Sequence, residues 1–263
     1  MYSKIVKKAL TVSFITILAA CSATKQGTQS TQMSAHTFDA REKLYQSTAN
    51  YPALINLYRD VLQYQINTKH KPDPKLSYKL AYAYFQNGDS QSTLAFLKPI
   101  LTNPTYQERA MALQVKALIQ SKKFQQAINI SNKLIRRNPN NPNYYNSRGV
   151  AYAQLGQIKK AQQDFQEARG HFLNDVIALN NLAMINIIDG EYKNAVRLLL
   201  PKYLNGQKEQ RLVHNLVFAL VKSGDTKYAK DIIIKEKLNT SPDALIAALK
   251  QTNRVSQQVT PIR

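Results

Sequence analysis

The feature that most restricts the fold of this chain is a repeat of 34 residues through most of its length. Five copies follow one another without insertion and begin at Pro74, Glu108, Pro142, Val176 and Gln210. One position is glycine in four copies and lysine in the second: Gly88, Lys122, Gly156, Gly190 and Gly224. Glycine adopts positive φ angles at little cost, so it marks a tight turn between two helices. Each unit is therefore expected to be a helix, a turn and a second helix.

Each copy also has small residues where its two helices must approach each other. Five residues after each turn position the second helix carries Thr93, Ala127, Ala161, Ala195 and Ala229. The matching positions of the first helix are Ala81, Val115, Gly149, Ala183 and Val217. A 34-residue period of paired helices resembles the tetratricopeptide (TPR) repeat, whose units stack around a continuous core. We therefore expect an all-α fold, a right-handed TPR superhelix of antiparallel helix pairs with a C-terminal capping helix.

The segments around the five repeats complete the expected domain organisation. Residues 35–73 are interpreted as a degenerate first repeat plus a connection, and residues 74–243 hold the five repeats in register. Ser241 and Pro242 form an N-cap and first-turn pair, which predicts a helix beyond them. We expect residues 244–263 to form a capping helix and a tail, because the last repeat of a solenoid otherwise exposes its apolar face.

The N-terminus has the layout of a bacterial lipoprotein signal. A segment with three lysines precedes an apolar run over residues 9–20, which is shorter than the roughly 20 residues that span a membrane. Residues 18–21, Leu-Ala-Ala-Cys, resemble the lipobox, which is cleaved before a cysteine that becomes acylated. We expect residues 1–20 to be a signal peptide, Cys21 the lipidated residue and residues 21–34 a flexible tether. An ordinary secreted protein with a chance cysteine is the alternative.

The expected location of the protein limits which classes of partner its strong positive charge can bind. Ser22 and not aspartate follows the cysteine, and in lipoproteins of this kind this implies sorting to the outer membrane, facing the periplasm. The chain has 36 lysines and arginines against 16 acidic residues, a formal net charge of +20. Because no genome lies in the periplasm, we expect no nucleic-acid partner. Acidic protein segments and anionic membrane surfaces then remain as partners for this charge.

No pattern of reactive side chains in the sequence points to catalysis. The single cysteine excludes an intramolecular disulfide, and no phosphate-binding Gly-Lys-Ser/Thr loop is present. The histidines are scattered without the spacing of metal ligands: His36, His70, His171 and His214. We therefore expect a protein that is not an enzyme, with no cofactor, no metal and no small-molecule substrate.

In TPR proteins the concave face is built from positions 2, 5, 9, 12 and 13 of each first helix. None of the residues at these positions is acidic, whereas basic, amide and aromatic side chains all occur. We expect this face to bind an acidic or carboxylate-ended peptide, with aromatic side chains as anchors. The candidates are Tyr78, Tyr82, Phe85, Lys116, Gln120, Asn146, Asn180, Met184, His214, Phe218 and Lys222. The alternative is that each of them is solvated or covers a neighbouring repeat.

Three stretches of the last three repeats resemble the TPR lipoprotein family of tight-adherence (Tad, or Flp) pilus assembly, the TadD family. They are Arg148–Gly156, Asn180–Ala183 and Val213–Leu220. The resemblance implies a pilotin-like scaffold that binds the Tad secretin and other pilus assembly proteins, while Cys21 anchors it in the outer membrane. The alternatives are a TPR lipoprotein of another envelope system, such as a type IV pilus pilotin-like factor, and a regulator of cell-wall enzymes.

Overall fold

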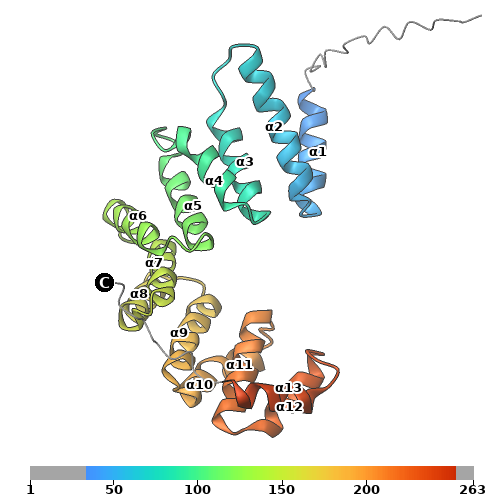
Figure 1. Ribbon diagram of the computed structural model, residues 1–263, viewed down its shortest axis with the longest axis vertical. Coiled ribbons are helices and arrows are strands. Elements are labelled where there is room, and N and C mark those ends of the chain that lie inside the picture. The colour runs from blue at the N-terminus through green and yellow to red at the C-terminus, as the bar shows by residue number, and fades with distance from the viewer. Residues whose placement is uncertain (1–33, 253–263) are drawn as a thin grey trace, which may run out of the picture. The chain divides into compact units, whose positions relative to one another are not determined.

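The computed structural model describes residues 34–252, and within this range all regular structure is helical (Figure 1). The predicted signal peptide, Cys21, the tether up to residue 33 and the tail after Thr252 lie outside the described residues. In chain order the helices are α1 (Ala35–Ser47), α2 (Tyr51–Asn67), α3 (Pro74–Gln86), α4 (Ser90–Leu97), the short 3-10 helix η1 (Lys98–Ile100), α5 (Gln107–Gln120), α6 (Phe124–Arg137), α7 (Pro142–Gln154), α8 (Ile158–Gly170), α9 (Asp175–Asp189), α10 (Tyr192–Leu204), α11 (Gln210–Ser223), α12 (Thr226–Lys235) and α13 (Pro242–Gln251).

The helices pack as pairs in chain order, and each pair packs on the next. Helices α3 and α4 form one pair, α7 and α8 another, and α13 contacts both α11 and α12. Three pairs of successive first helices also contact each other: α3 and α5, α5 and α7, and α9 and α11. Within residues 34–252 no contact of similar extent joins successive second helices. The first helices therefore form the more closely packed inner face of the stack.

The turn between the two helices of each repeat has the same backbone conformation. Its φ angles are 84° at Gly88, 60° at Lys122, 71° at Gly156, 78° at Gly190 and 97° at Gly224. Lysine thus adopts the left-handed conformation that glycine takes in the other four repeats. In the second repeat the N–H of Lys123 closes this turn by donating to the Leu118 carbonyl at 2.8 Å. The repeat therefore imposes this geometry even where the residue type does not favour it.

Short polar side chains begin several helices and satisfy their free N–H groups. The Asp73 carboxylate accepts from the N–H of Lys75 at 2.8 Å, and the Asn141 side chain accepts from Asn143 at 3.0 Å. Helix α13 begins at Pro242 after Ser241, which confirms the predicted N-cap and first-turn pair, although the Ser241 side chain makes no capping hydrogen bond. Its first turn is favourable for proline, which has no N–H to satisfy.

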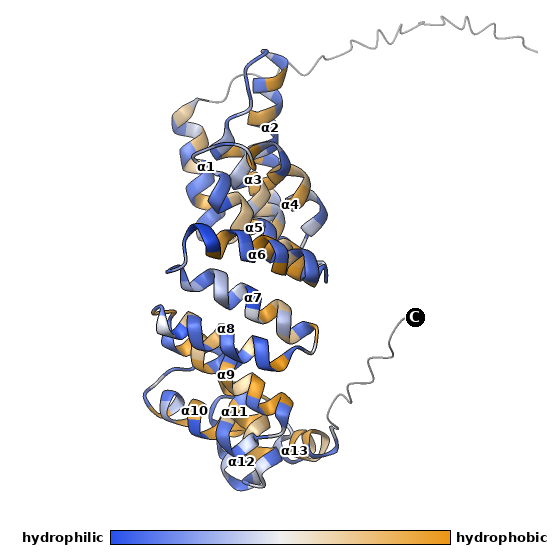
Figure 2. Ribbon diagram, turned by 90° about the vertical axis from the view of Figure 1, so that its left-hand side faces the viewer, coloured by the Kyte–Doolittle hydropathy of each residue, from blue (hydrophilic) through white to orange (hydrophobic). Residues whose placement is uncertain are grey.

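Small residues at the interface allow the paired helices to approach each other. Ala161 and Ala195 are fully buried. At Gly149 in α7 a Cβ atom would lie 2.7 Å from the Phe165 ring of α8, so no larger residue fits without displacing that ring. Figure 2 shows that most of the helices carry both apolar and polar residues.

A largely buried ion pair joins α7 to α8. The Arg148 guanidinium donates to both carboxylate oxygens of Asp164, at 2.6 and 2.8 Å, and to the side-chain oxygen of Asn132 in α6 at 2.6 Å. The side chains of Arg148 and Asp164 are 19% and 5% exposed. Such a bidentate contact stabilises the pair and also fixes the relative orientation of the two side chains. One arginine therefore links three successive helices.

Many acidic side chains of residues 34–252 are occupied by contacts within the fold. Glu42 pairs with Lys79 at 2.6 Å and accepts from Tyr58, while Glu236 pairs with Lys208 at 2.6 Å and accepts from Tyr203. Burial, followed by the contact with Glu236, raises the pKa of Tyr203 to about 12. Because these acidic side chains already have partners within the fold, the excess basic side chains remain available to bind other molecules.

Candidate functional site

Two pockets lie along the inner face formed by the first helices. The central pocket has a volume of about 510 Å³ and is lined by α3, α5, α6, α7 and residues just before α5 and α7. The C-terminal pocket has a volume of about 550 Å³ and lies between α9, α11, α13 and the segment before α13. Both have the size expected of a binding pocket for a few side chains. Their linings differ in chemistry.

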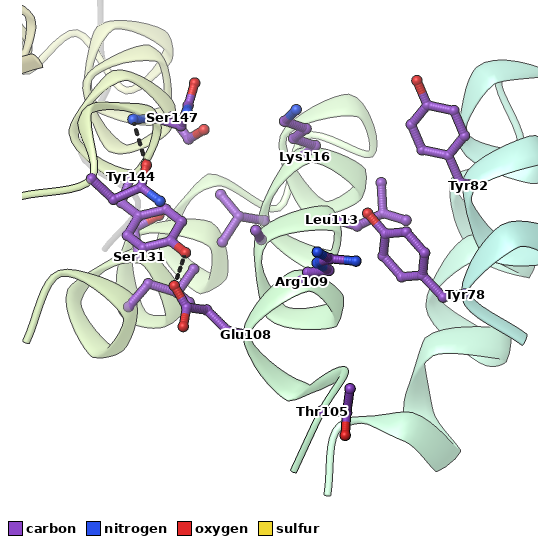
Figure 3. Close-up of a pocket in the computed structure, with 15 residues that line it drawn as sticks. Tyr78, Tyr82, Thr105, Glu108, Arg109, Leu113, Lys116, Ser131, Tyr144 and Ser147 are labelled. Atoms are coloured by element: carbon purple, nitrogen blue, oxygen red, sulfur yellow. Dashed lines mark hydrogen bonds between the residues drawn. The ribbon is translucent and has the colours of Figure 1, made fainter. Parts of the chain in front are cut away.

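The central pocket combines aromatic and cationic side chains (Figure 3). Helix α3 contributes Tyr78 and Tyr82, and α5 contributes Arg109 and Lys116, both of which are exposed. Burial raises the pKa of Tyr78, while the nearby Arg109 lowers it, so the phenol is neutral at physiological pH. Two cations beside a neutral aromatic wall suit a segment that carries carboxylates.

An acidic side chain that the sequence-based choice of positions missed also lines the central pocket. Glu108 stands at the first position of its repeat, outside the five positions taken to form the concave face. Its carboxylate accepts a short hydrogen bond from the Tyr144 hydroxyl of α7 (Figure 3). Burial, and then the contact with Glu108, raises the pKa of Tyr144, which keeps this hydroxyl protonated as a donor. With Arg109 and Lys116, the pocket still carries one net positive charge.

The buried part of the central pocket includes Ser131 of α6, a residue with no exposed surface. Its hydroxyl has no hydrogen-bond partner among the described residues. The same repeat position holds larger apolar residues in the other four copies: Leu97, Phe165, Leu199 and Ile233. The smaller side chain leaves room between α5 and α6, and we attribute part of the depth of the pocket to it.

The C-terminal pocket is apolar. It is lined by Met184, Ile187, Val217, Phe218, Leu238, Leu245 and Leu249, with His214, Asn215 and Asn239 as its polar residues. None of these residues is an acid, a lysine or an arginine. The Phe218 ring packs edge-on against Tyr192 at 6.2 Å between centroids, which fixes one wall.

Six of the eleven predicted groove residues line these pockets. Tyr78, Tyr82 and Lys116 lie in the central pocket, and Met184, His214 and Phe218 lie in the C-terminal pocket. The other five, Phe85, Gln120, Asn146, Asn180 and Lys222, line neither. Their contacts within the fold explain this difference.

Two of these five are asparagines that join neighbouring repeats. The side-chain oxygen of Asn146 accepts from the Asn181 amide at 2.6 Å, and that of Asn180 accepts from the Asn215 amide at 2.9 Å. The same pair of positions is thus used twice, one repeat apart. We expected Asn146 and Asn180 to lie on the binding face, but their side-chain oxygens accept hydrogen bonds from the next repeat.

The remaining three also have partners within the fold. Phe85 packs against the core around Leu97, and the Gln120 side chain accepts from the Ser90 hydroxyl at 2.6 Å. Lys222 donates to the backbone carbonyls of Lys250, at 3.1 Å, and Thr252 at the end of α13. A lysine here satisfies carbonyls that the helix leaves free. Lys222 therefore holds the capping helix, and we do not count it among the cations free for a partner.

Comparison with known proteins agrees with this geometry. The family model of the tetratricopeptide repeat matches residues 131–163. The crystal structure of a TPR protein from Parabacteroides merdae ATCC 43184 is similar with a TM-score of 0.62 and 18% identity, over 82% of this chain and 84% of that protein. The fold is that of TPR proteins. Such folds typically serve as scaffolds for binding other proteins.

Two further solved structures are similar to this chain. A thermophilic TPR protein from Thermus thermophilus has a TM-score of 0.58 and 19% identity, over 70% of this chain and 97% of its own. MamA from Desulfovibrio magneticus has a TM-score of 0.52 and 17% identity, over 65% and 97%. No curated protein matches the chain by sequence. At these identities the likeness establishes the fold alone.

Neither a metal cluster nor a spanning helix occurs in the described part of the chain. Residues 34–252 hold no group of three or more His, Cys, Asp or Glu side chains arranged to bind a metal ion. None of the helices in this range is long and apolar enough to cross a bilayer.

Proposed function

We propose that this chain is a lipid-anchored scaffold on the periplasmic face of the outer membrane that binds a partner protein on its inner face. The observation that carries this proposal is the central pocket, where Arg109 and Lys116 lie beside Tyr78 and Tyr82. Protein interfaces favour such arginine and tyrosine anchors. Without residues 1–20, which carry three lysines and no acidic residue, the anchored chain keeps a formal charge of +17, which attracts acidic segments over longer distances.

The sequence supports a pilotin-like role in assembly of the Tad (Flp) type IVb pilus secretion apparatus, with the secretin as the partner. The support consists of the lipobox that ends at Cys21 and the TadD-like stretches of the last three repeats. Several acyl chains, each contributing about 0.8 kcal/mol per buried methylene, would hold Cys21 in the bilayer. A tether of about 13 residues has an end-to-end distance on the order of 20 Å and would keep the start of the folded part near the lipid surface. The anchored groove would present the bound secretin at the membrane where it assembles.

Reversal of one charge in the central pocket tests this proposal. We expect Lys116→Glu to reduce capture of the secretin from solubilised envelope about tenfold, because the new carboxylate repels an acidic segment. The side chain is exposed, so the free energy of unfolding should change by less than about 0.5 kcal/mol. Quantitative mass spectrometry of the captured proteins, with thermal unfolding beside it, measures both quantities.

Lys133→Glu is the matched control, because Lys133 is an exposed lysine of α6 that lines neither pocket. It makes the same change of net charge. If Lys116→Glu and Lys133→Glu reduce secretin capture equally, overall charge explains the reduction and the central pocket is not the binding site. If Lys116→Glu instead reduces the capture of a different envelope protein, the chain is still a scaffold that binds a partner, but the assignment to pilus assembly is wrong.

A further inference from the structure

The apolar surface of the inner face extends beyond the C-terminal pocket. Met184 and Ile188 of α9 are 38% and 39% exposed, and Ile177 of the same helix is 47% exposed. Spacings of seven and four residues place these three side chains on one side of α9. Exposed apolar residues that gather beside an apolar pocket mark an interaction surface more strongly than scattered ones do.

The capping helix helps to form this pocket in addition to covering the last repeat. Leu245 and Leu249 of α13 face Phe218 of α11 across the cavity as part of its lining. Lys222 holds the end of α13 through two carbonyls, and Lys230 of α12 pairs with Asp243 near its start at 2.7 Å. Side chains of α11 and α12 therefore contact α13 at both of its ends.

We infer that the C-terminal pocket is a second docking subsite, which takes apolar side chains of the segment whose acidic residues lie at the central pocket. This inference rests on the proposed function, because it takes the inner face as the docking surface. It commits to a partner segment with an acidic part and an apolar part. Arg109 and Lys116 complement the first part, and the uncharged lining around Met184 and Phe218 complements the second.

Helix packing sets the spacing between the two parts of the segment. From α5 the inner face continues through α7 to α9 and α11, and the Asn146 to Asn181 and Asn180 to Asn215 bonds link these helices. Packed helices lie roughly 8–10 Å apart. The centre of the C-terminal pocket is then roughly 25 Å from Lys116, a distance that about seven or eight extended residues span. Linking two weak contacts at a matched spacing strengthens the binding of the whole segment.

Synthetic peptides and the lipidated protein in nanodiscs provide the test. The parent peptide has three glutamates, about seven neutral residues and a Leu-Phe pair; in a second peptide Ser-Ser replaces Leu-Phe. Fluorescence anisotropy gives the affinity of each peptide for the wild-type chain, Met184→Glu, Lys116→Glu and Leu204→Glu. Leu204 is a control, because it is 65% exposed and lines neither pocket.

We expect the wild-type chain to bind the parent peptide about ten- to a hundredfold more tightly than the Ser-Ser peptide, as burial of two apolar side chains allows. Met184→Glu should remove this difference, whereas Leu204→Glu should preserve it. Lys116→Glu should lower the affinity for both peptides by the same factor, because both peptides keep the acidic part.

Three results would overturn the inference. If Met184→Glu binds the parent peptide as the wild type does while Lys116→Glu binds it weakly, the second subsite is wrong and the inner-face scaffold stands. If neither substitution weakens the parent peptide, or no peptide binds, the docking surface itself is wrong. If a chain that ends at Thr252 binds the parent peptide more tightly than the full chain does, and the Ser-Ser peptide shows no such gain, the C-terminal pocket is occupied by the chain's own tail and not by the partner.

Discussion

Replacement of Arg148 by alanine is expected to lower the free energy of unfolding by about 3–5 kcal/mol, the usual cost of removing one partner of a buried ion pair. The substitution leaves the Asp164 carboxylate, only 5% exposed, without its cation. It also removes a guanidinium that lies 5.7 Å from the ring centroid of Tyr145 and 5.8 Å from that of Tyr152. Urea unfolding followed by helical circular dichroism measures the loss.

Two companion variants separate the buried pair from an ordinary surface charge. Arg169 forms an exposed pair with Asp175 at 3.4 Å, with side chains that are 52% and 48% exposed, so Arg169→Ala should cost less than about 1 kcal/mol. The double variant Arg148→Met with Asp164→Leu should regain most of the loss, because it leaves no buried charge unpaired. If Arg148→Ala is as mild as Arg169→Ala, the ion pair does not hold α7 and α8 together.

Replacement of Cys21 by alanine, behind a signal peptide of ordinary secreted proteins so that cleavage still occurs, is expected to move nearly all of the protein into the soluble periplasmic fraction. Without the cysteine no acyl chains can be attached, and the chain loses the attachment that several such chains supply. The first helix of the described residues begins at Ala35, well after this residue, so we expect no change in helix content or in the unfolding curve. Fractionation with immunoblotting, and circular dichroism of the released protein, measure the two effects.

A change at the next residue gives the matched control. Ser22→Asp keeps the lipidated cysteine, and the resemblance to bacterial lipoproteins implies that an aspartate here retains the protein in the inner membrane. This variant should therefore remain in the membrane fraction but change membranes. Persistent sedimentation of Cys21→Ala with outer membranes would refute the lipid anchor.

The helix pairs of the five repeats could be predicted because their requirements recur every 34 residues. A turn that needs a positive φ angle shows itself when glycine returns at Gly88, Gly156, Gly190 and Gly224. The single exception, Lys122, could be interpreted correctly because its neighbours in the register fix the expected conformation. Periodicity of this kind averages over local irregularities that would mislead an interpretation of one segment alone.

Contacts between repeats could not be predicted in the same way. The oxygens of Asn146 and Asn180 meet amides 35 residues further along the chain, and nothing in a single repeat position distinguishes such a bond from exposure to solvent. Lys222 was predicted as a residue of the peptide-binding groove, because its contact with α13 depends on how a helix outside the repeat register docks. These side chains satisfy neighbouring polar groups and are therefore less available to a partner.

The inner face was predicted as a single surface with basic, amide and aromatic side chains, whereas the structure divides it into two chemically different parts. The cationic part, with Arg109 and Lys116, follows from the predicted positions and their neighbours. The apolar part depends on Leu245 and Leu249, which belong to the capping helix and have no counterpart in the repeat pattern. Only the docking of α13 brings these leucines beside Phe218.

Site-specific photocrosslinking in intact cells tests most directly whether the inner face binds the partner. A photoreactive phenylalanine analogue would replace Tyr82, which is 44% exposed in the central pocket, or Lys133, which is exposed on α6. We predict a crosslink from position 82 to an acidic segment of an envelope protein, and none to that protein from position 133. A crosslink to the same partner from position 133 alone, or equally from both positions, would contradict the assignment of the inner face as the docking surface.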